Sequence, residues 1–284
     1  MKDFTLLNGN KIPSLAYGTW LIDNKIADNC VKLALEAGYR HIDTAQAYRN
    51  EEGVGKGIRE SGIPREDIYL TTKVDASHKS YKTAKKSIDE SLQRLGVDYI
   101  DLILIHCPQP WVLYRGPFKY YKANREVWRA LEDAYNEGKV RAIGVSNFNN
   151  KDMQNILDHC KIKPMVNQVL CHIGNTPMDV IKFCQERDII IEAYSPIAHG
   201  KALKNKSIIA MAEKYNASVP QLCIKYTLQL DTISIPKATS KAHIEDNMKL
   251  DFEISKEDMV ELIKLNKFDY GEDSMWPVFK NSKM

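Results

Sequence analysis

The stretch GYRHIDTAQAYRNEEGVG, residues 38–55, runs from a short apolar strand into a loop and then into a glycine-rich segment. The strand ends in a carboxylate, Asp43, and Tyr48 follows five residues later. Neither side chain helps to build an apolar core, and such groups at a strand end are typical of a reactive site. Each also has a structural alternative, since Asp43 could cap a helix and Tyr48 could be a half-buried aromatic residue.

The same alternation of strand and helix repeats along the chain. Helical periodicity is clear in residues 82–96, which Gly96 ends, and in residues 124–139, with Val127, Leu131 and Tyr135 on one face. The predicted strands are residues 15–19, 40–43, 68–73, 101–106, 141–146, 164–168, 189–194 and 233–236.

Eight strands, each followed by a helix, predict a (β/α)8 TIM barrel. A doubly wound sheet alternates in the same way. It usually has fewer strands, however, and it leaves no place for the hairpin predicted at residues 5–13, where Asn8-Gly9 supplies the positive φ of a tight turn. No linker interrupts the pattern, so we expect a single domain over residues 1–284 with an N-terminal β-hairpin.

Composition narrows the class of protein. Hydrophobic residues make up 44% of the chain and charged residues 27%, and the net charge is +3, which gives no reason to expect nucleic acid or a membrane as partner. The six cysteines form no Cys-x-x-Cys pair, and the N-terminus lacks the apolar core of a signal peptide. We therefore expect a cytoplasmic protein. Without a heptad pattern, we expect a monomer.

The barrel prediction places the expected active site at the carboxyl ends of the strands, where active sites of such barrels lie. Reactive and amide side chains gather there in unusual density. They are Trp20, Asp43 with Tyr48, Lys73, His106, Ser146, Asn147, Gln168, Tyr194 and Lys237.

Four of these residues suggest proton transfer. A phenol has an ordinary pKa near ~10, and an adjacent ammonium lowers it by favouring the phenolate. Lys73 would be that ammonium, Asp43 its partner and Tyr48 the acid. His106 would orient a carbonyl oxygen, although a lone histidine after an apolar strand is often only a packed core residue.

The chain resembles the aldo-keto reductase family along nearly its whole length. The similar motifs are GYRHIDTAQAY (38–48), DLILIHCP (101–108), EGKVRAIGVSNF (137–148), VNQV (166–169), AYSP (193–196) and IPKATSKAHIEDN (235–247). The resemblance implies hydride transfer from a nicotinamide to an aldehyde or ketone. It matches Tyr48 to the general acid and Asp43, Lys73 and His106 to its supporting residues.

The cofactor side follows from the same resemblance. Tyr194 would stack on the nicotinamide, and Ser146, Asn147 and Gln168 would hold its amide, although Ser-Asn after a strand can also start a helix. No G-x-G-x-x-G motif is present, and residues 53–57 lack the spacing of a phosphate-binding loop, so we expect them to open a helix against the barrel. Further contacts are expected, to the phosphates and the adenine end, from Ser195, Ile197, Lys237, Ser240, His243, Asp246 and Asn247.

Two departures from the family concern the phosphate end. The family commonly has a serine after the lysine and an arginine six residues after it, where this chain has Ala238 and His243. A histidine is mostly neutral at pH 7 and lacks the fork of an arginine. We expect NADPH as cofactor with a weakened preference, and NADH as an alternative.

Two further departures concern the substrate mouth. The family usually has tryptophan at the positions of Asp75 and Cys107, so their loss should widen the pocket and make it more polar. Trp20 remains as a wall. The role of residues 110–125, which are rich in aromatic side chains, is open between a lid and a packed loop.

Three other classes are weaker alternatives. A barrel glycosidase needs paired carboxylates, and Glu192 has no evident mate in the sequence. A metal-dependent hydrolase needs a ligand cluster, and the seven histidines are dispersed. A non-catalytic sensor of pyridine nucleotides on the same barrel remains an alternative, which the set of four residues argues against.

Overall fold

The structure is a computed structural model that describes residues 3–279. Eight parallel strands form one sheet, in chain order around the barrel. They are β3 (Ala16–Gly18), β4 (His41–Asp43), β5 (Tyr69–Val74), β6 (Leu102–Ile105), β7 (Ile143–Ser146), β8 (Val166–Leu170), β9 (Ile190–Tyr194) and β10 (Ile233–Ile235). Each lies within a predicted strand or within two residues of it.

The sheet closes between its first and last strands. Leu15 forms a parallel bridge with Ser234, whose N–H donates to the carbonyl of Ser14 over 2.9 Å. The N–H of Gly18 donates to the carbonyl of Pro236, also over 2.9 Å. The predicted TIM barrel is therefore confirmed.

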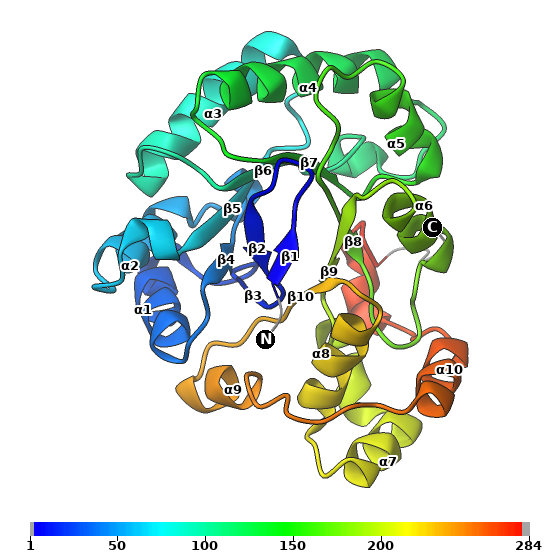
Figure 1. Ribbon diagram of the computed structural model, residues 1–284. Helices are drawn as coiled ribbons and strands as arrows, with labels where there is room; N and C mark the ends of the chain where they lie inside the picture. The colour runs from blue at the N-terminus through cyan, green and yellow to red at the C-terminus, as the bar shows by residue number, and fades with distance from the viewer. Residues whose placement is uncertain (1–2, 280–284) are drawn as a thin grey trace.

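Helices surround the barrel (Figure 1). The α-helices are α1 (Asn24–Glu36), α2 (Glu51–Arg59), α3 (Tyr81–Leu95), α4 (Tyr121–Asn136), α5 (Asn150–Leu157), α6 (Met178–Gln185), α7 (Lys206–Lys214), α8 (Val219–Gln229), α9 (Lys241–Asp246) and α10 (Lys256–Lys264). Short 3-10 helices are η1 (Gln46–Tyr48), η2 (Arg65–Asp67), η3 (Trp111–Leu113), η4 (Ala198–Lys204) and η5 (Gly271–Met275). As the sequence predicted, Gly96 ends α3 with a left-handed φ of 61°.

The N-terminal hairpin closes one end of the barrel. Strands β1 (Asp3–Thr5) and β2 (Lys11–Pro13) pair antiparallel, and the buried side chains of Leu6 and Ile12 pack with those of the barrel interior. Gly9 has the expected positive φ, 87°, but the loop between the paired strands spans residues 6–10 and is longer than a two-residue turn. Figure 1 views the barrel from this end, so the open rim lies on the far side.

The glycine-rich run after Tyr48 is a packing feature of helix α2. A Cβ at Gly53 would lie 2.4 Å from the carbonyl oxygen of Asn24 in α1. At Gly55 it would lie 1.9 Å from the carbonyl oxygen of Leu95 at the end of α3. The glycines thus let α2 approach both neighbouring helices, which agrees with the prediction of a helix rather than a phosphate loop.

The barrel interior holds an apolar cluster and a set of buried polar side chains. Leu102, Leu104, Val166 and Ile233 form the apolar part. Side chains two residues apart on a strand point to the same face, and this periodicity places polar groups on β4, β5, β8 and β9. The fully or nearly fully buried polar side chains there are His41, Asp43, Thr71, Lys73, Gln168 and Glu192.

Within residues 3–279, no helix is both long and apolar enough to span a membrane. The same part of the chain holds no group of three His, Cys, Asp or Glu side chains arranged to bind a metal ion.

Candidate active site

The four residues predicted for proton transfer meet at the rim. Asp43 ends β4, Tyr48 ends η1, Lys73 lies in β5 and His106 follows β6. The ammonium of Lys73 donates to Asp43 Oδ1 over 2.7 Å, to the carbonyl of Thr44 over 2.8 Å and to the hydroxyl of Tyr48 over 3.2 Å. Its three hydrogens are therefore all used, and they link a buried ion pair to a phenol that borders the cleft.

Burial and neighbouring charges shift the pKa values of this cluster in opposite directions. Burial by itself lowers the pKa of Lys73, but the negative charge and hydrogen bond of Asp43 outweigh it, and the pKa is raised overall. The pKa of Tyr48 is raised as well, because burial outweighs the attraction of the Lys73 charge for a phenolate. Lys73 does lower the pKa of Tyr48, as expected, but burial leaves that pKa raised overall. Tyr48 is therefore a protonated phenol at neutral pH.

His106 is a neutral imidazole that borders the same space. Burial and then the charge of Lys73 lower its pKa well below the ordinary value. Its Nδ1 is buried without a hydrogen-bond partner among the described residues. The ring packs edge-on against Tyr48 at 5.6 Å and against Trp111 at 5.0 Å between centroids. This packing fixes the imidazole beside the phenol.

Four residues of β7 to β9 form the second part of the site. Asn147 has a left-handed φ of 63°, and its Nδ2 donates to the carbonyl of His106 over 3.0 Å. Its Oδ1 accepts from the hydroxyl of Tyr194 over 2.7 Å. The hydroxyl of Ser146 donates to the backbone carbonyl of Gln168 over 2.9 Å. These bonds tie the carboxyl ends of four strands, β6 to β9, into one wall, opposite Asp43 and Tyr48 on the rim.

A cleft of about 710 Å³ lies over these groups. The lining residues that the sequence predicted as site residues are Trp20, Asp43, Tyr48, His106, Ser146, Asn147, Gln168, Tyr194, Ser195, Ile197, Lys237, His243, Asp246 and Asn247. Unpredicted lining residues include Trp111, Leu203, Trp276 and Val278. Its size and mixed lining suit an elongated organic ligand.

The loop after β9 bends sharply along this cleft. Ser195, Ala198 and His199 have left-handed φ values of 53°, 51° and 52°, which are uncommon for residues other than glycine. His199 also makes a contact with the C-terminal segment, in which Asp273 accepts from its Nδ1 at 3.1 Å and binds Lys201 at the same distance. The loop is thereby held in place at the edge of the cleft.

Comparison with known proteins shows which family the chain belongs to. The sequence model of the Aldo/keto reductase family matches residues 14–267. The chain belongs to this family. It is 42% identical over 270 residues to a glyoxal reductase of Bacillus subtilis, covering 94% of both chains. It is also 42% identical over 268 residues to a 9,11-endoperoxide prostaglandin H2 reductase of Trypanosoma cruzi, covering 93% of this chain and 91% of that one.

Solved structures agree with this assignment. An aldo/keto reductase of Brucella melitensis superposes with a TM-score of 0.86 at 39% identity, over 93% of this chain and 97% of that one. An aldo-keto reductase of Bombyx mori in complex with NADP has a TM-score of 0.85 at 33% identity, over 99% of both chains. The protein is thus an NAD(P)H-dependent oxidoreductase that reduces an aldehyde or ketone to an alcohol. Neither the fold nor these relatives give support to a non-catalytic sensor.

Two predicted substrate contacts of this aldo-keto reductase are absent from the lining of the cleft. Cys107 is fully buried, and the carboxylate of Asp75 accepts from the backbone and hydroxyl of Ser77 at the outer surface. Asp75 and Cys107 therefore do not line this cleft, contrary to the prediction, and the indoles of Trp111 and Trp276 border it.

Trp111 is the main residue that the sequence analysis missed. It lies in η3, at the start of the segment whose role was open, and the helix α4 begins at Tyr121. Gln109 folds the loop between them, since its Nε2 donates to the carbonyls of Gly116 and Phe118 and its Oε1 accepts from the N–H of Arg115. The segment is thus a packed loop that directs one indole toward His106.

Ser240, a predicted phosphate contact, and Asp246, a predicted contact at the adenine end, both have structural partners. Ser240 caps α9 by accepting from the N–H of His243, and it does not border the cleft. Asp246 borders the cleft, but its carboxylate accepts from Ser218 Oγ over 2.9 Å and from Gln221 Nε2 over 3.0 Å. These bonds join α9 to α8. The sequence could not predict these partners of Asp246, because the two helices meet only in the folded chain.

Proposed function

We propose that Tyr48 is the general acid of this reductase, supported by Lys73, Asp43 and His106. The observation that carries the proposal is the set of three hydrogen bonds from the buried Lys73 ammonium, one of which reaches Tyr48. A buried ammonium is costly unless it is paired. Its placement directly beneath a cleft-facing phenol therefore points to stabilisation of negative charge on that phenol.

The cofactor site fits a nicotinamide nucleotide. Both amide hydrogens of Gln168 bind carboxyl groups, so its oxygen is left as an acceptor beside the cleft. We infer that this oxygen and the side chains of Ser146 and Asn147 hold the carboxamide, with Tyr194 as the surface behind the ring. When bound, the reduced nicotinamide supplies the hydride to the substrate carbon.

The residues of the chain then handle the proton. The substrate oxygen lies between Tyr48 and His106, and the neutral imidazole orients it. Tyr48 gives its proton to this oxygen as negative charge develops there. The phenolate that remains is stabilised by the Lys73 ammonium, which Asp43 holds in place, until it takes a proton from solvent.

We propose NADPH as the main cofactor, with a weakened preference that allows NADH. Among the described residues that line the cleft, Lys237 is the only lysine. His243 also lines the cleft, at the position where the family commonly has an arginine. One lysine attracts a 2′-phosphate, but the imidazole of His243 lacks the bidentate grip of an arginine. A moderate discrimination between the two nucleotides follows.

We propose a small reactive aldehyde or ketone as substrate, reduced by a cytoplasmic monomer. The name of the Bacillus subtilis relative, glyoxal reductase, and the indoles of Trp20 and Trp111 at the cleft support a compact substrate with an apolar or planar body. All six cysteines are free, which suits a reducing compartment.

The test is cofactor oxidation with a small dicarbonyl such as glyoxal, measured in parallel with NADPH and NADH. Turnover with both nucleotides, with the higher kcat/KM for NADPH, is the expected result. Turnover with NADPH alone would overturn the weakened preference. Binding of both nucleotides without oxidation, for several aldehydes and ketones, would overturn the proposed substrate class and mechanism.

A further inference from the structure

Glu192 is a fully buried acid that the mechanism above does not use. It lies in β9, two residues before Tyr194, inside the barrel and outside the lining of the cleft. Its Oε2 accepts a hydrogen bond of 2.7 Å from Nε2 of Gln168. The same nitrogen donates to Asp43 Oδ2 over 2.8 Å. Glu192 and Asp43 thus accept from the same amide nitrogen of Gln168.

This bridge fixes the orientation of an amide. An amide side chain has nearly the same shape when its oxygen and nitrogen are exchanged, so its hydrogen-bond partners alone decide which end points where. With Asp43 and Glu192 both accepting, the two hydrogens of Gln168 are consumed. The reversed amide would bring its oxygen against Oδ2 of Asp43, which would lose its donor. Only the amide oxygen therefore remains for a ligand in the cleft.

The surroundings of Glu192 keep its carboxyl neutral. Titratable groups face it from β4 and β5, and they are His41, Asp43, Tyr69 and Lys73. Burial and then the charge of Asp43 raise the pKa of Glu192 to about 8. Its other oxygen, Oε1, has no hydrogen-bond partner among the described residues and lies 3.7 Å from Nε2 of His41. A neutral side chain of the same shape should therefore replace it.

We propose that Glu192 is a positioning residue that accepts one hydrogen of the Gln168 amide and so keeps the amide oxygen directed at the carboxamide of the nicotinamide. The inference rests on the proposed contact between Gln168 and the cofactor. Glu192 itself touches neither cofactor nor substrate. Its effect should appear in the recognition of the carboxamide N–H₂ and not in the binding of the rest of the nucleotide.

The experiment compares dissociation constants for NADP⁺ and for its 3-acetylpyridine analogue, in which a methyl group replaces the carboxamide N–H₂. The wild type should bind NADP⁺ tighter by about 3–10-fold, the value of one hydrogen bond. In Glu192→Met only Asp43 still accepts from the amide, which is then held less firmly, so the ratio should fall to about 2-fold or less. Glu192→Gln keeps the acceptor and the shape, and its ratio should stay within about 2-fold of the wild type.

Controls separate this effect from a loss of stability. Glu51→Met removes a carboxylate that is also buried, and that binds Thr72 and Arg94 away from the cleft. It should lower the melting temperature and leave the ratio unchanged. If Glu192→Met does not fold, Glu192→Thr replaces it, since threonine suits a strand and is too short to reach the amide.

The outcomes distinguish two failures. If Gln168→Ala leaves the ratio unchanged, the proposed contact between Gln168 and the carboxamide is wrong. If Gln168→Ala reduces the ratio but Glu192→Met and Glu192→Thr do not, the contact stands and the role of Glu192 is overturned. A fall in the ratio for Gln168→Ala and Glu192→Met, with recovery in Glu192→Gln, supports the inference.

Discussion

The ammonium of Lys73 donates to the hydroxyl oxygen of Tyr48 over 3.2 Å, and this contact joins a fully buried charge to the open cleft. Removing the ammonium should therefore change both the stability of the fold and the reductase activity. Lys73→Met leaves Asp43 buried without its countercharge, which should cost about 3–5 kcal/mol of unfolding free energy. Urea unfolding measures this loss.

The double variant Asp43→Asn, Lys73→Met tests whether that cost comes from the unpaired charge. Its unfolding free energy should recover much of the loss, because no buried charge is then left unpaired. Its reductase activity should stay at least about 10²-fold below the wild type, since the phenolate of Tyr48 has lost its stabilising charge. Recovery of activity together with stability would show that Lys73 serves the fold alone.

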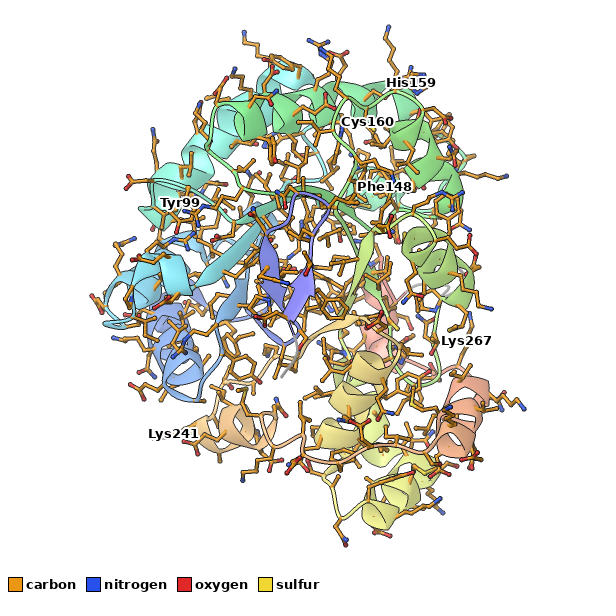
Figure 2. All side chains as sticks on the ribbon, viewed as in Figure 1. Tyr99, Phe148, His159, Cys160, Lys241 and Lys267 are labelled. Atoms are coloured by element: carbon orange, nitrogen blue, oxygen red, sulfur yellow. The ribbon has the colours of Figure 1, made fainter. Side chains whose placement is uncertain are left out.

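Nucleotide preference should respond to His243. His243→Arg adds a permanent charge and a bidentate fork beside the cleft, so the KM for NADPH should fall by about 10-fold while the KM for NADH stays within about 2-fold. Ala242→Arg is the matched control, because it adds the same charge on α9 outside the cleft lining. Figure 2 shows that Lys241, the first residue of this helix, lies at the periphery of the molecule. Equal effects of the two variants would contradict a specific role for position 243.

The indole of Trp111 should recognise planar substrates. It packs edge-on against His106 at the cleft. Trp111→Ala should raise the KM for benzaldehyde by about 2–10-fold, in line with the loss of one aromatic contact, and leave the Kd for NADPH unchanged. Val112→Ala is the control, since this neighbouring side chain is exposed to solvent. An unchanged KM in Trp111→Ala would place the substrate elsewhere in the cleft.

Glu192 gives a pH dependence of stability. Its pKa is about 8 in the folded protein, against an ordinary value of 4.5. The folded state holds the proton more tightly than the unfolded state, so this stabilisation is fully present below about pH 4.5 and is lost as the pH rises to about 8. Glu192→Gln does not titrate. Its melting temperature should approach that of the wild type at pH 5 and exceed it by about 5 °C or more at pH 8.5. A constant difference across this range would contradict the raised pKa.

Much of the fold could be predicted from the sequence because it depends on local patterns. Strand positions, the cap at Gly96 and the helix that starts after Asn50 follow from periodicity and turn residues. Asp43 and Lys73 could be placed at the rim because each ends or nearly ends a strand of the barrel. The rule that strand ends carry the site needs no knowledge of side-chain packing.

Trp111, Glu192 and Ser240 could not be assigned in this way. The direction of Trp111 depends on hydrogen bonds from Gln109 within its loop, which composition does not reveal. The partner of Glu192 lies on another strand and is shared with Asp43. Ser240 was matched to a phosphate contact, but the helix that follows it uses its hydroxyl as a cap. Each case depends on contacts that form only in the folded chain.

The direct test of the mechanism is Tyr48→Phe, measured by rapid mixing of the NADPH complex with glyoxal. The ring and its packing against His106 remain, and only the hydroxyl that accepts from Lys73 is lost. The account predicts that the Kd for NADPH stays within about 3-fold while the rate of NADPH oxidation falls by at least about 10²-fold at every pH tested. Oxidation at a rate close to that of the wild type would contradict the assignment of Tyr48 as the proton donor.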